Sequence, residues 1–302
     1  MYNMNLCNNN AINNIIHNKQ NHFYWTMIQK MDNSIELREN LKNINNYSND
    51  FFKIIESKEQ WTYADPFLYY YNDELYLFFE ALNMNRLNKR NVKGIGEIYY
   101  CKIECKNNEY LYSIPCVALQ KPWHLSFPFI IEYNNSIYMI PEQSSQNLDI
   151  YKCIEFPNKW EFEKTLIKGS FVDSVVFFYN DYYWLFTIQK QRNNRIERLY
   201  YSKDLLGEWE LHAKVNKISN NKTAQRGAGN IFIMNNKIFR PVQNNINYYG
   251  QGTLFYEITK LNTEEYEHIV YDTLKRNIHH FNYLNGFFVI DSNNTSRDFF
   301  IE

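Results

Sequence analysis

Residues Trp61–Glu80 read W-T-Y-A-D-P-F-L-Y-Y-Y-N-D-E-L-Y-L-F-F-E. Two apolar, aromatic-rich runs flank Asn72-Asp73, and such a two-residue centre suits the primed turns that join antiparallel strands with the correct twist. The stretch therefore predicts a tight β-hairpin. With Asn72 and Asp73 at the turn, Asp65 is expected opposite Glu80, which sets two carboxylates at the open end of the hairpin.

Four similar hairpins follow along the chain. Their turn centres are Asn134-Asn135, Asn180-Asp181, Asn235-Asn236 and Asn285-Gly286. The same pairing sets Phe127 opposite Glu142, Asp173 opposite Ile188, Ala228 opposite Gln243, and His280 opposite Asp291. The hairpins start roughly 45 to 65 residues apart, which is close to the spacing of propeller blades. Strand-like runs between them bring the total to about four strands in each repeat.

The predicted fold is an all-β, five-bladed β-propeller over residues 22–302. Residues 1–21 are rich in asparagine and are expected to be disordered or frayed. Phe23–Gln29 has strand composition, and an N-terminal strand that completes the last blade would leave no open sheet edge. Asp32–Lys58 is predicted to be a short helix or a loop. The five paired positions would then ring one mouth of the central channel, which is the candidate site.

Composition narrows the classes of partner. The 302 residues carry 32 Lys plus Arg and 33 Asp plus Glu, so the net charge of −1 provides no field for nucleic acid or an anionic membrane. No apolar run reaches ~18 residues, and the N-terminus lacks a basic region followed by an apolar core. We therefore expect a cytoplasmic protein with no transmembrane segment and no nucleic-acid partner.

Common catalytic and cofactor signatures are missing from the sequence. It contains no G-x-x-x-x-G-K-[ST], G-x-G-x-x-G, H-E-x-x-H or G-x-S-x-G motif. The five cysteines lack the paired CxxC spacing of a zinc site. No cofactor is expected to be required.

Carboxylates gather at the predicted mouth. Asp65, Glu80, Glu142 and Asp173 come from three hairpins. Clustered carboxylates raise one another's pKa, which yields one protonated donor and one ionised base at neutral pH, the pair that glycosyl chemistry needs. In the alternative interpretation, the same side chains cap strand ends or accept hydrogen bonds from backbone amides and arginines.

Other polar side chains are expected near this mouth. Arg226 is predicted to meet a phosphate or a carboxylate, and Gln243 and Tyr249 to form hydrogen bonds with a ligand. Arg240 occupies a column that is apolar in the other hairpins, so it must be paired or line a cavity. A structural Arg–carboxylate pair and a ligand contact both fit this position.

Three further side chains have more than one interpretation. Trp123 could stack on a sugar face or fill a gap between blades. His124 beside it is equally ambiguous. His280 could be a core histidine, a ligand contact or one ligand of an axial cation, and a lone histidine does not specify a metal site.

Several motifs then occur in order: A-D-P-F at 64–67, H-L-S-F-P-F at 124–129, I-P-E at 140–142, V-D-S at 172–174, R-G-A-G-N at 226–230 and F-R-P-V-Q at 239–243. Together they resemble the propeller domain at the N-terminus of plant glucosamine inositolphosphorylceramide transferases, over about residues 60–292. This resemblance implies a carbohydrate-active propeller of surface-glycan or glycolipid biosynthesis that works with a glycosyltransferase.

More distantly, the chain resembles the five-bladed propeller hydrolases of the arabinanase, xylosidase and invertase group. That resemblance implies Asp65 as base or nucleophile and Asp173 as the residue that tunes the site. The acid of arabinanase-type members falls on a blade after the second aspartate, where this chain has Gln243. Glu142 comes earlier in the chain, so the sequence departs from the hydrolase pattern at the acid.

Three functions follow from these observations. The leading hypothesis is that the mouth binds a glycan, glycolipid or nucleotide sugar and assists glycosyl transfer. The second is a glycoside hydrolase with Asp65 as base, Asp173 as tuner and Glu142 as acid. The third is a non-catalytic scaffold for a partner glycosyltransferase. Because Pro141 cannot donate to a strand ladder, we expect the strand to end there and Glu142 to turn outward. Glu142 is then expected to contact substrate hydroxyls or Arg226.

Overall fold

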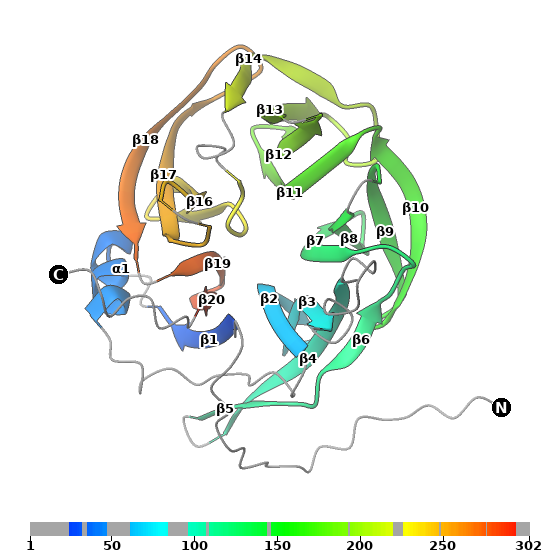
Figure 1. Ribbon diagram of the computed structural model, residues 1–302, viewed down its shortest axis with the longest axis vertical. Coiled ribbons are helices and arrows are strands. Elements are labelled where there is room, and N and C mark those ends of the chain that lie inside the picture. The colour runs from blue at the N-terminus through cyan, green and yellow to red at the C-terminus, as the bar shows by residue number, and fades with distance from the viewer. Residues whose placement is uncertain are drawn as a thin grey trace.

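The computed structural model describes residues 24–31, 35–46, 61–83, 96–106, 109–143, 146–192, 194–219, 226–247, 249–275 and 277–293. The predicted disordered segment, residues 1–21, lies outside these ranges. The described residues form an all-β propeller with one helix, which confirms the predicted fold class at that level. Figure 1 shows the sheets arranged around a common centre, with strands β2, β7, β11 and β19 nearest to it.

The strands make five antiparallel sheets. In chain order the first holds β2 (Trp61–Tyr71), β3 (Glu74–Asn83), β4 (Gly96–Lys106) and β5 (Glu109–Tyr112), with β6 (Cys116–Leu119) also on β4. The second holds β7 (Leu125–Tyr133), β8 (Ser136–Gln143), β9 (Leu148–Glu155) and β10 (Lys159–Ile167). The third holds β11 (Ser170–Tyr179), β12 (Tyr182–Gln191), β13 (Asn194–Ser202) and β14 (Glu210–Ser219). The fourth holds β15 (Phe232–Met234), β16 (Lys237–Asn244), β17 (Gly252–Leu261) and β18 (Tyr266–Leu274). The fifth holds β19 (Ile278–Leu284), β20 (Phe287–Asn293) and β1 (Tyr24–Lys30).

All five predicted hairpin turns are present. Their centres have positive φ, as primed turns require. The residues are Asn72 and Asp73, Asn134 and Asn135, Asn180 and Asp181, Asn235 and Asn236, and Asn285 and Gly286. In the first and third hairpins the turn lies at the end opposite to Asp65 and Asp173, which confirms the predicted direction of these strands.

The predicted pairing at the open end is wrong by one residue in three hairpins. Phe67 faces Phe78 as expected, but Ala64 rather than Asp65 faces Glu80, because the first strand holds one extra residue. The same shift sets Ser126 rather than Phe127 opposite Glu142, and Val172 rather than Asp173 opposite Ile188. The extra residue is a β-bulge, which bends the strand and turns a side chain to a new direction. The alternating apolar pattern does not reveal such an insertion.

The bulged strands share a backbone conformation. Asp65, Phe127 and Asp173 have φ of 51°, 47° and 50°. Positive φ is uncommon for residues other than glycine, and Asp tolerates it better than most. The three residues thus hold equivalent places in three sheets, and two of the three are aspartates.

The last two hairpins differ from these three. Ala228 does not face Gln243, because Gly227 pairs with Val242 and the Ala228 N–H donates to the Pro241 carbonyl at 3.1 Å. His280 faces Asp291 as predicted, and the extra residue of this hairpin is His279. Two consecutive histidines therefore lie beside the bulge.

Two elements precede the first hairpin. Strand β1 pairs antiparallel with β20, in a register that sets Thr26 opposite Asp291. Helix α1 (Leu37–Asn46) lies in the stretch predicted as a helix or a loop, and it buries Leu37 and Leu41 in one apolar cluster with Phe232 and Leu274. Within the described ranges, no helix has the length and apolar character needed to cross a membrane.

Candidate functional site

Buried carboxylates meet at the central end of the sheets. The exposed fractions are 7% for Asp65, 8% for Glu142, 2% for Asp173 and 0% for Asp291. Asp65 and Asp173 lie in bulges of β2 and β11, whereas Glu142 and Asp291 lie on the second strands of their hairpins. Four sheets thus supply acids to one site. Ionised groups this deeply buried need charged partners or hydrogen bonds.

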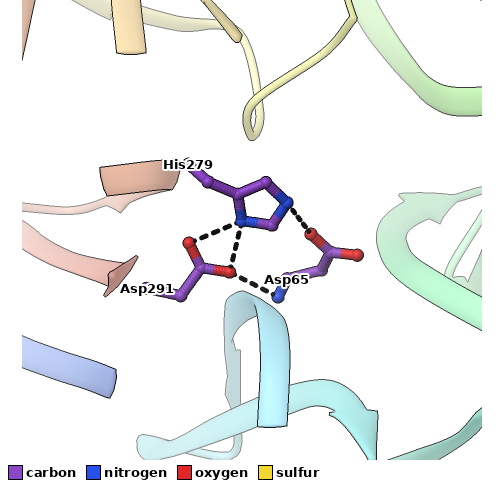
Figure 2. Close-up of side chains that lie close together, drawn as sticks. All are labelled: Asp65, His279 and Asp291. Atoms are coloured by element: carbon purple, nitrogen blue, oxygen red, sulfur yellow. Dashed lines mark hydrogen bonds and ion pairs between the residues drawn. The ribbon is translucent and has the colours of Figure 1, made fainter. Parts of the chain in front are cut away.

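Asp65, His279 and Asp291 form one half of the site, and Figure 2 shows their side chains turned toward one another. His279 Nδ1 lies 2.8 Å from both carboxylate oxygens of Asp291, and His279 Nε2 lies 3.5 Å from Asp65 Oδ1. The backbone N–H of Asp65 donates to Asp291 Oδ2 at 2.9 Å. Asp291 therefore holds both the histidine and the bulge that carries Asp65.

Arg226 organises the other half of the site. Its guanidinium donates two hydrogen bonds to Asp173, from Nε to Oδ2 and from Nη2 to Oδ1, the second at 2.9 Å. Arg226 Nη2 also lies 3.8 Å from Glu142 Oε2, and Lys190 Nζ lies 3.6 Å from Glu142 Oε1. The two-point geometry is the strong form of an Arg–carboxylate pair. Arg226 therefore meets carboxylates of the chain itself, and its predicted contact with a ligand stays a prediction.

Glu142 does not turn outward. Strand β8 continues through Pro141 to Gln143, so the predicted end of the strand at the proline is wrong. Pro141 is tolerated because its ring removes only one donor from the ladder. Glu142 is consequently buried beside Arg226, a contact that the sequence did predict.

Burial controls the protonation of the acids. It raises the pKa of Asp65 from 3.8 to about 7, with neighbouring carboxylates adding to the rise and nearby cations opposing it. Burial also raises the pKa of Glu142 to about 7, and Asp173 adds to this effect. The pKa of Glu80 rises well above its usual value for the same reason, helped by Asp65. Near neutral pH the site thus offers protonated carboxyl donors beside ionised acceptors.

The two histidines differ in charge. Burial alone would lower the pKa of His279, but the Asp291 carboxylate outweighs it and raises that pKa to about 9. Burial opposes the ionisation of Asp291, yet His279 holds its pKa below the usual value. Burial lowers the pKa of His280 to about 3. His279 is therefore an imidazolium paired with Asp291 at neutral pH, whereas His280 is neutral.

His280 lies deeper than His279. Its side chain is fully buried, and the rings of Phe67 and Phe127 pack on it at centroid distances of 4.8 and 5.4 Å. His280 Nδ1 lies 3.7 Å from Asp65 Oδ1. The burial of His280 agrees with its predicted role as a core histidine, and the residue also neighbours the acidic cluster.

Asp65, His279 and Asp291 are also the described residues whose spacing could suit a metal ion, since one ligand atom from each lies within 4.8 Å of the others. Their contacts fit an ion-pair network instead. Both ring nitrogens of His279 face oxygen acceptors, and a metal would need one nitrogen without its hydrogen. The predicted cation near His280 stays a prediction.

The remaining predicted residues surround this cluster. His124 Nε2 lies 3.6 Å from Glu80 Oε1, while His124 Nδ1 accepts the Gly96 N–H at 2.9 Å. Trp123 Nε1 donates to Gln143 Oε1 at 3.0 Å, so its ring is fixed beside the second sheet. Glu80 and His124 therefore extend the site toward the first and second sheets.

Gln243 and Tyr249 border Arg226. The Gln243 N–H donates to the Arg226 carbonyl at 2.8 Å, and the Gln243 side-chain amide donates to the Gly227 carbonyl at 3.2 Å. The Tyr249 hydroxyl lies 3.0 Å from His279 Nε2, and the Arg226 guanidinium lies 5.5 Å from the Tyr249 ring centroid. Gln243 shapes the backbone under Arg226, and Tyr249 joins the two halves of the site.

Arg240 serves packing between the third and fourth sheets. Its Nη1 donates to Glu197 Oε1 at 2.6 Å and to the Tyr266 hydroxyl at 3.3 Å, and the guanidinium lies 4.7 Å from the Phe186 ring centroid. Burial opposes the charge, but Glu197 outweighs it and raises the pKa of Arg240 further. We therefore assign Arg240 to a structural ion pair rather than to ligand binding. Of its two predicted roles, the structural Arg–carboxylate pair is the one that these contacts support.

Sequence reasoning did not assign roles to His279, Asp291 or Lys190. Asp291 was expected at the mouth only as the partner of His280 in the strand register. The sequence feature that could have indicated a role for His279 is the pair of adjacent histidines, because a bulge between them brings both side chains to Asp65. Lys190 gave no signal, since one lysine near a strand end is common on protein surfaces.

Comparison with known proteins finds a family model and plant relatives that are similar in sequence. The family model described as "Glucosamine inositolphosphorylceramide transferase 1, N-terminal" matches residues 55–289. Glucosamine inositolphosphorylceramide transferase 1 of Oryza sativa subsp. japonica is 34% identical over 213 residues, which cover 68% of this chain and 27% of that protein. The Arabidopsis thaliana protein of the same name is 34% identical over 214 residues, covering 68% and 26%. The chain thus matches about a quarter of the length of these relatives.

Solved structures with a similar fold include glycoside hydrolases. A thermostable family-43 glycoside hydrolase gives a TM-score of 0.54 at 14% identity, covering 79% of this chain and 86% of that one. Zg3597, a family 117 glycoside hydrolase of Zobellia galactanivorans, gives 0.53 at 11% identity, covering 85% and 78%. These likenesses support the fold alone. The family model and the plant relatives decide the family: the chain belongs to the family of the N-terminal part of glucosamine inositolphosphorylceramide transferase 1.

Proposed function

We propose that this chain binds a glycan or activated sugar at the central end of its sheets and takes part in the assembly of a glycolipid or surface glycan. The observation that carries the proposal is the meeting of four buried carboxylates with Arg226 and His279. Protonated carboxyls donate to sugar hydroxyls and ionised carboxylates accept from them, so the site offers both kinds of partner.

The relatives suggest the chemistry around the site. Their name refers to a transferase of glucosamine and inositolphosphorylceramide, and this chain corresponds to about a quarter of their length. We infer that the propeller presents a sugar or glycolipid to a transferase. Asp65, Asp173 and Glu142 would be the central contacts, with Glu80, His124, Arg226 and Tyr249 around them.

The proposal includes the number of blades. We infer five blades, one for each sheet, with β1 completing the fifth as an outer strand. The pairing of β1 with β20 supports this, because it joins the start of the described chain to the last hairpin. A ring closed in this way leaves the inner hairpins fixed around one site.

Substitution of the two bulge aspartates tests the proposal. Asp65→Asn and Asp173→Asn keep the side-chain shape and tolerate positive φ, so the fold should remain. A ligand at ~100 times its dissociation constant stabilises a protein by roughly 2.7 kcal/mol, which thermal shift detects. We expect UDP-N-acetylglucosamine or a glucosamine-containing glycan to stabilise the wild type and neither variant.

The matched control is Asp181→Asn. Asp181 also has positive φ, 61°, but it is exposed in a turn at the opposite end of the propeller. This variant should respond to ligand as the wild type does. Equal ligand shifts in the wild type and both bulge variants would remove Asp65 and Asp173 from the site.

Hydrolysis is the second candidate, favoured by the raised pKa of Glu142. A carboxyl group that stays protonated near neutral pH has the property of a general acid. Cleavage of aryl glycosides or oligosaccharides by the purified protein, abolished by Glu142→Gln with binding retained, would establish the hydrolase. Binding without cleavage supports the leading proposal.

A further inference from the structure

The buried carboxyl groups of the site differ in the hydrogen bonds that they accept from the chain. Both oxygens of Asp173 accept from the Arg226 guanidinium. Both oxygens of Asp291 lie 2.8 Å from His279 Nδ1, and Asp291 Oδ2 also accepts the backbone N–H of Asp65. The chain itself therefore supplies the partners of these two aspartates.

The side chains of Asp65, Glu80 and Glu142 accept no hydrogen bond from the part of the chain that the structure describes. Their ion-pair partners lie 3.5 Å from Asp65 Oδ1, 3.6 Å from Glu80 Oε1 and 3.6 Å from Glu142 Oε1. Hydrogen bonds from nitrogen to oxygen are shorter, at about 2.7–3.2 Å. Figure 2 shows the second carboxylate oxygen of Asp65 turned away from both His279 and Asp291.

These three side chains are largely buried, yet their oxygens remain open to the site. The exposed fractions of the side chains are 9% for Asp65, 12% for Glu80 and 8% for Glu142. None of their oxygens is among the described atoms that are sealed from solvent without a hydrogen bond. A ligand can therefore reach them, and a buried carboxyl group is stabilised by the hydrogen bonds that a ligand provides.

The local structure around Glu80 directs it toward the other two acids. Gly96 N–H donates to His124 Nδ1 at 2.9 Å, so the hydrogen of this ring is on Nε2, the atom that faces Glu80. A Cβ on residue 96 would lie 2.7 Å from Glu80 Oε1 and 2.8 Å from His124 Cε1, so glycine leaves the room that both side chains occupy. The charges of Asp65 and Glu142 raise the pKa of Glu80 in addition to burial, which places the three acids around one space.

The spacing of the three acids does not suit a metal ion. Within the described ranges, the residues whose ligand atoms gather closely enough for one ion are Asp65, His279 and Asp291. Asp65, Glu80 and Glu142 do not form such a group. A ligand that meets all three must therefore present several polar groups at once, as the hydroxyls of a sugar ring do.

The charges of the site disfavour an anionic ligand. Arg226 pairs with Asp173, His279 with Asp291, and Lys190 Nζ lies 3.6 Å from a Glu142 oxygen. The carboxyl groups of the site outnumber these cations. A diphosphate would therefore compete with carboxylates that are already paired and would meet repulsion from the others.

We propose that Asp65, Glu80 and Glu142 bind the hydroxyl groups of an uncharged sugar, so that the ligand of this site is a glycan rather than a nucleotide sugar. This inference rests on the proposed function and selects one class among the ligands that it allows. Ionised carboxylates accept from sugar hydroxyls, whereas protonated carboxyls also donate to them, so the three acids match a ring that carries several hydroxyls.

A glycan array tests the charge of the ligand with the wild-type chain alone. The array carries uncharged glycans beside sulfated, phosphorylated and sialylated ones, and UDP-N-acetylglucosamine and UDP-glucose are added as soluble competitors. We expect binding to uncharged glycans that neither UDP-sugar reduces. Binding confined to anionic glycans, or displacement by a UDP-sugar, would overturn this inference and leave the proposed function standing. Failure to bind any glycan or UDP-sugar would refute the proposed function itself.

Glu80→Met tests the third acid, with calorimetry on the uncharged glycan that binds most tightly to the array. Methionine keeps the length of the side chain and removes both oxygens, so affinity should fall by roughly tenfold while the melting temperature does not fall. Glu80→Gln retains hydrogen-bonding atoms and should bind more tightly than Glu80→Met. The matched control is Glu74→Met, at the turn end of the same strand, which should bind as the wild type does. Wild-type affinity in Glu80→Met would overturn the role of Glu80, and so would a melting temperature far below that of the wild type, because it would make Glu80 a structural residue.

Discussion

Replacing Glu142 by Gln should make the protein more stable at alkaline pH. The pKa of this carboxyl group is raised from 4.5 to about 7, because burial and Asp173 oppose its charge more than Arg226 and Lys190 favour it. A raised carboxyl pKa means that stability is highest below the unfolded value and falls as pH rises through the folded value. At about pH 8, therefore, ionised Glu142 lowers the stability of the native state.

The size of the effect follows from the two pKa values. Each unit corresponds to 1.36 kcal/mol, so the change from 4.5 to about 7 amounts to about 3 kcal/mol. With about 2.1 cal/mol/K of unfolding entropy per residue over 302 residues, this corresponds to a rise in melting temperature of roughly 5 °C. The difference should vanish near pH 4, where both folded and unfolded chains hold the proton.

Thermal unfolding of wild type and Glu142→Gln between about pH 4 and pH 9 measures this directly. Glu161→Gln, an exposed glutamate on β10, is the control and should change little at any pH. A Glu142→Gln variant that melts below the wild type at about pH 8 would refute the reasoning. In that case Arg226 and Lys190 stabilise an ionised Glu142 by more than burial costs, and the group cannot be a proton donor at neutral pH.

Three further predictions concern stability. The pKa of His279 is raised to about 9, so its pairing with Asp291 should stabilise the fold by about 3 kcal/mol below pH 6.5 and lose this effect as pH rises through about 9. In urea unfolding, the free energy of unfolding of His279→Gln should be well below that of the wild type near pH 6 and close to it near pH 10. Arg240→Met should cost roughly 3–5 kcal/mol by leaving Glu197 buried without its partner, and adding Glu197→Leu should recover most of that loss in the same assay. Gly229→Ala should prevent stable folding, because the new Cβ would lie 1.8 Å from the Phe281 carbonyl oxygen, and a melting temperature equal to the wild type would contradict this.

The turns of the propeller were predictable because their chemistry is local. Asn-Asp, Asn-Asn and Asn-Gly pairs tolerate positive φ, and each ends up at a turn centre. The register near each turn was predictable for the same reason. Beyond Phe67 the prediction fails, since the backbone N–H of Asp65, at the extra residue, donates to the Asp291 carboxylate of another sheet.

The candidate site was predicted in part. Asp65, Asp173, Glu142 and Arg226 come together as expected, because equivalent places in repeated hairpins must meet at one end of a propeller. The role of His279 depends on a bulge between two histidines, which residue type alone does not indicate. Arg240 could not be separated from the site residues by sequence, since a buried arginine in an apolar column looks the same whether its partner is a ligand or Glu197.

The pairing of β1 with β20 makes the site depend on local unfolding. Thr26 of β1 lies opposite Asp291, and Asp291 in turn holds His279 and the backbone of Asp65. A strand that pairs on one side only, as β1 does, opens at lower free energy than a whole domain. Each time β1 detaches, β20 becomes a sheet edge at the residue that anchors the acids. Gentle heating or dilute denaturant should consequently abolish ligand binding while the other four sheets remain folded. The rate at which β1 detaches would then determine the lifetime of the form that binds ligand.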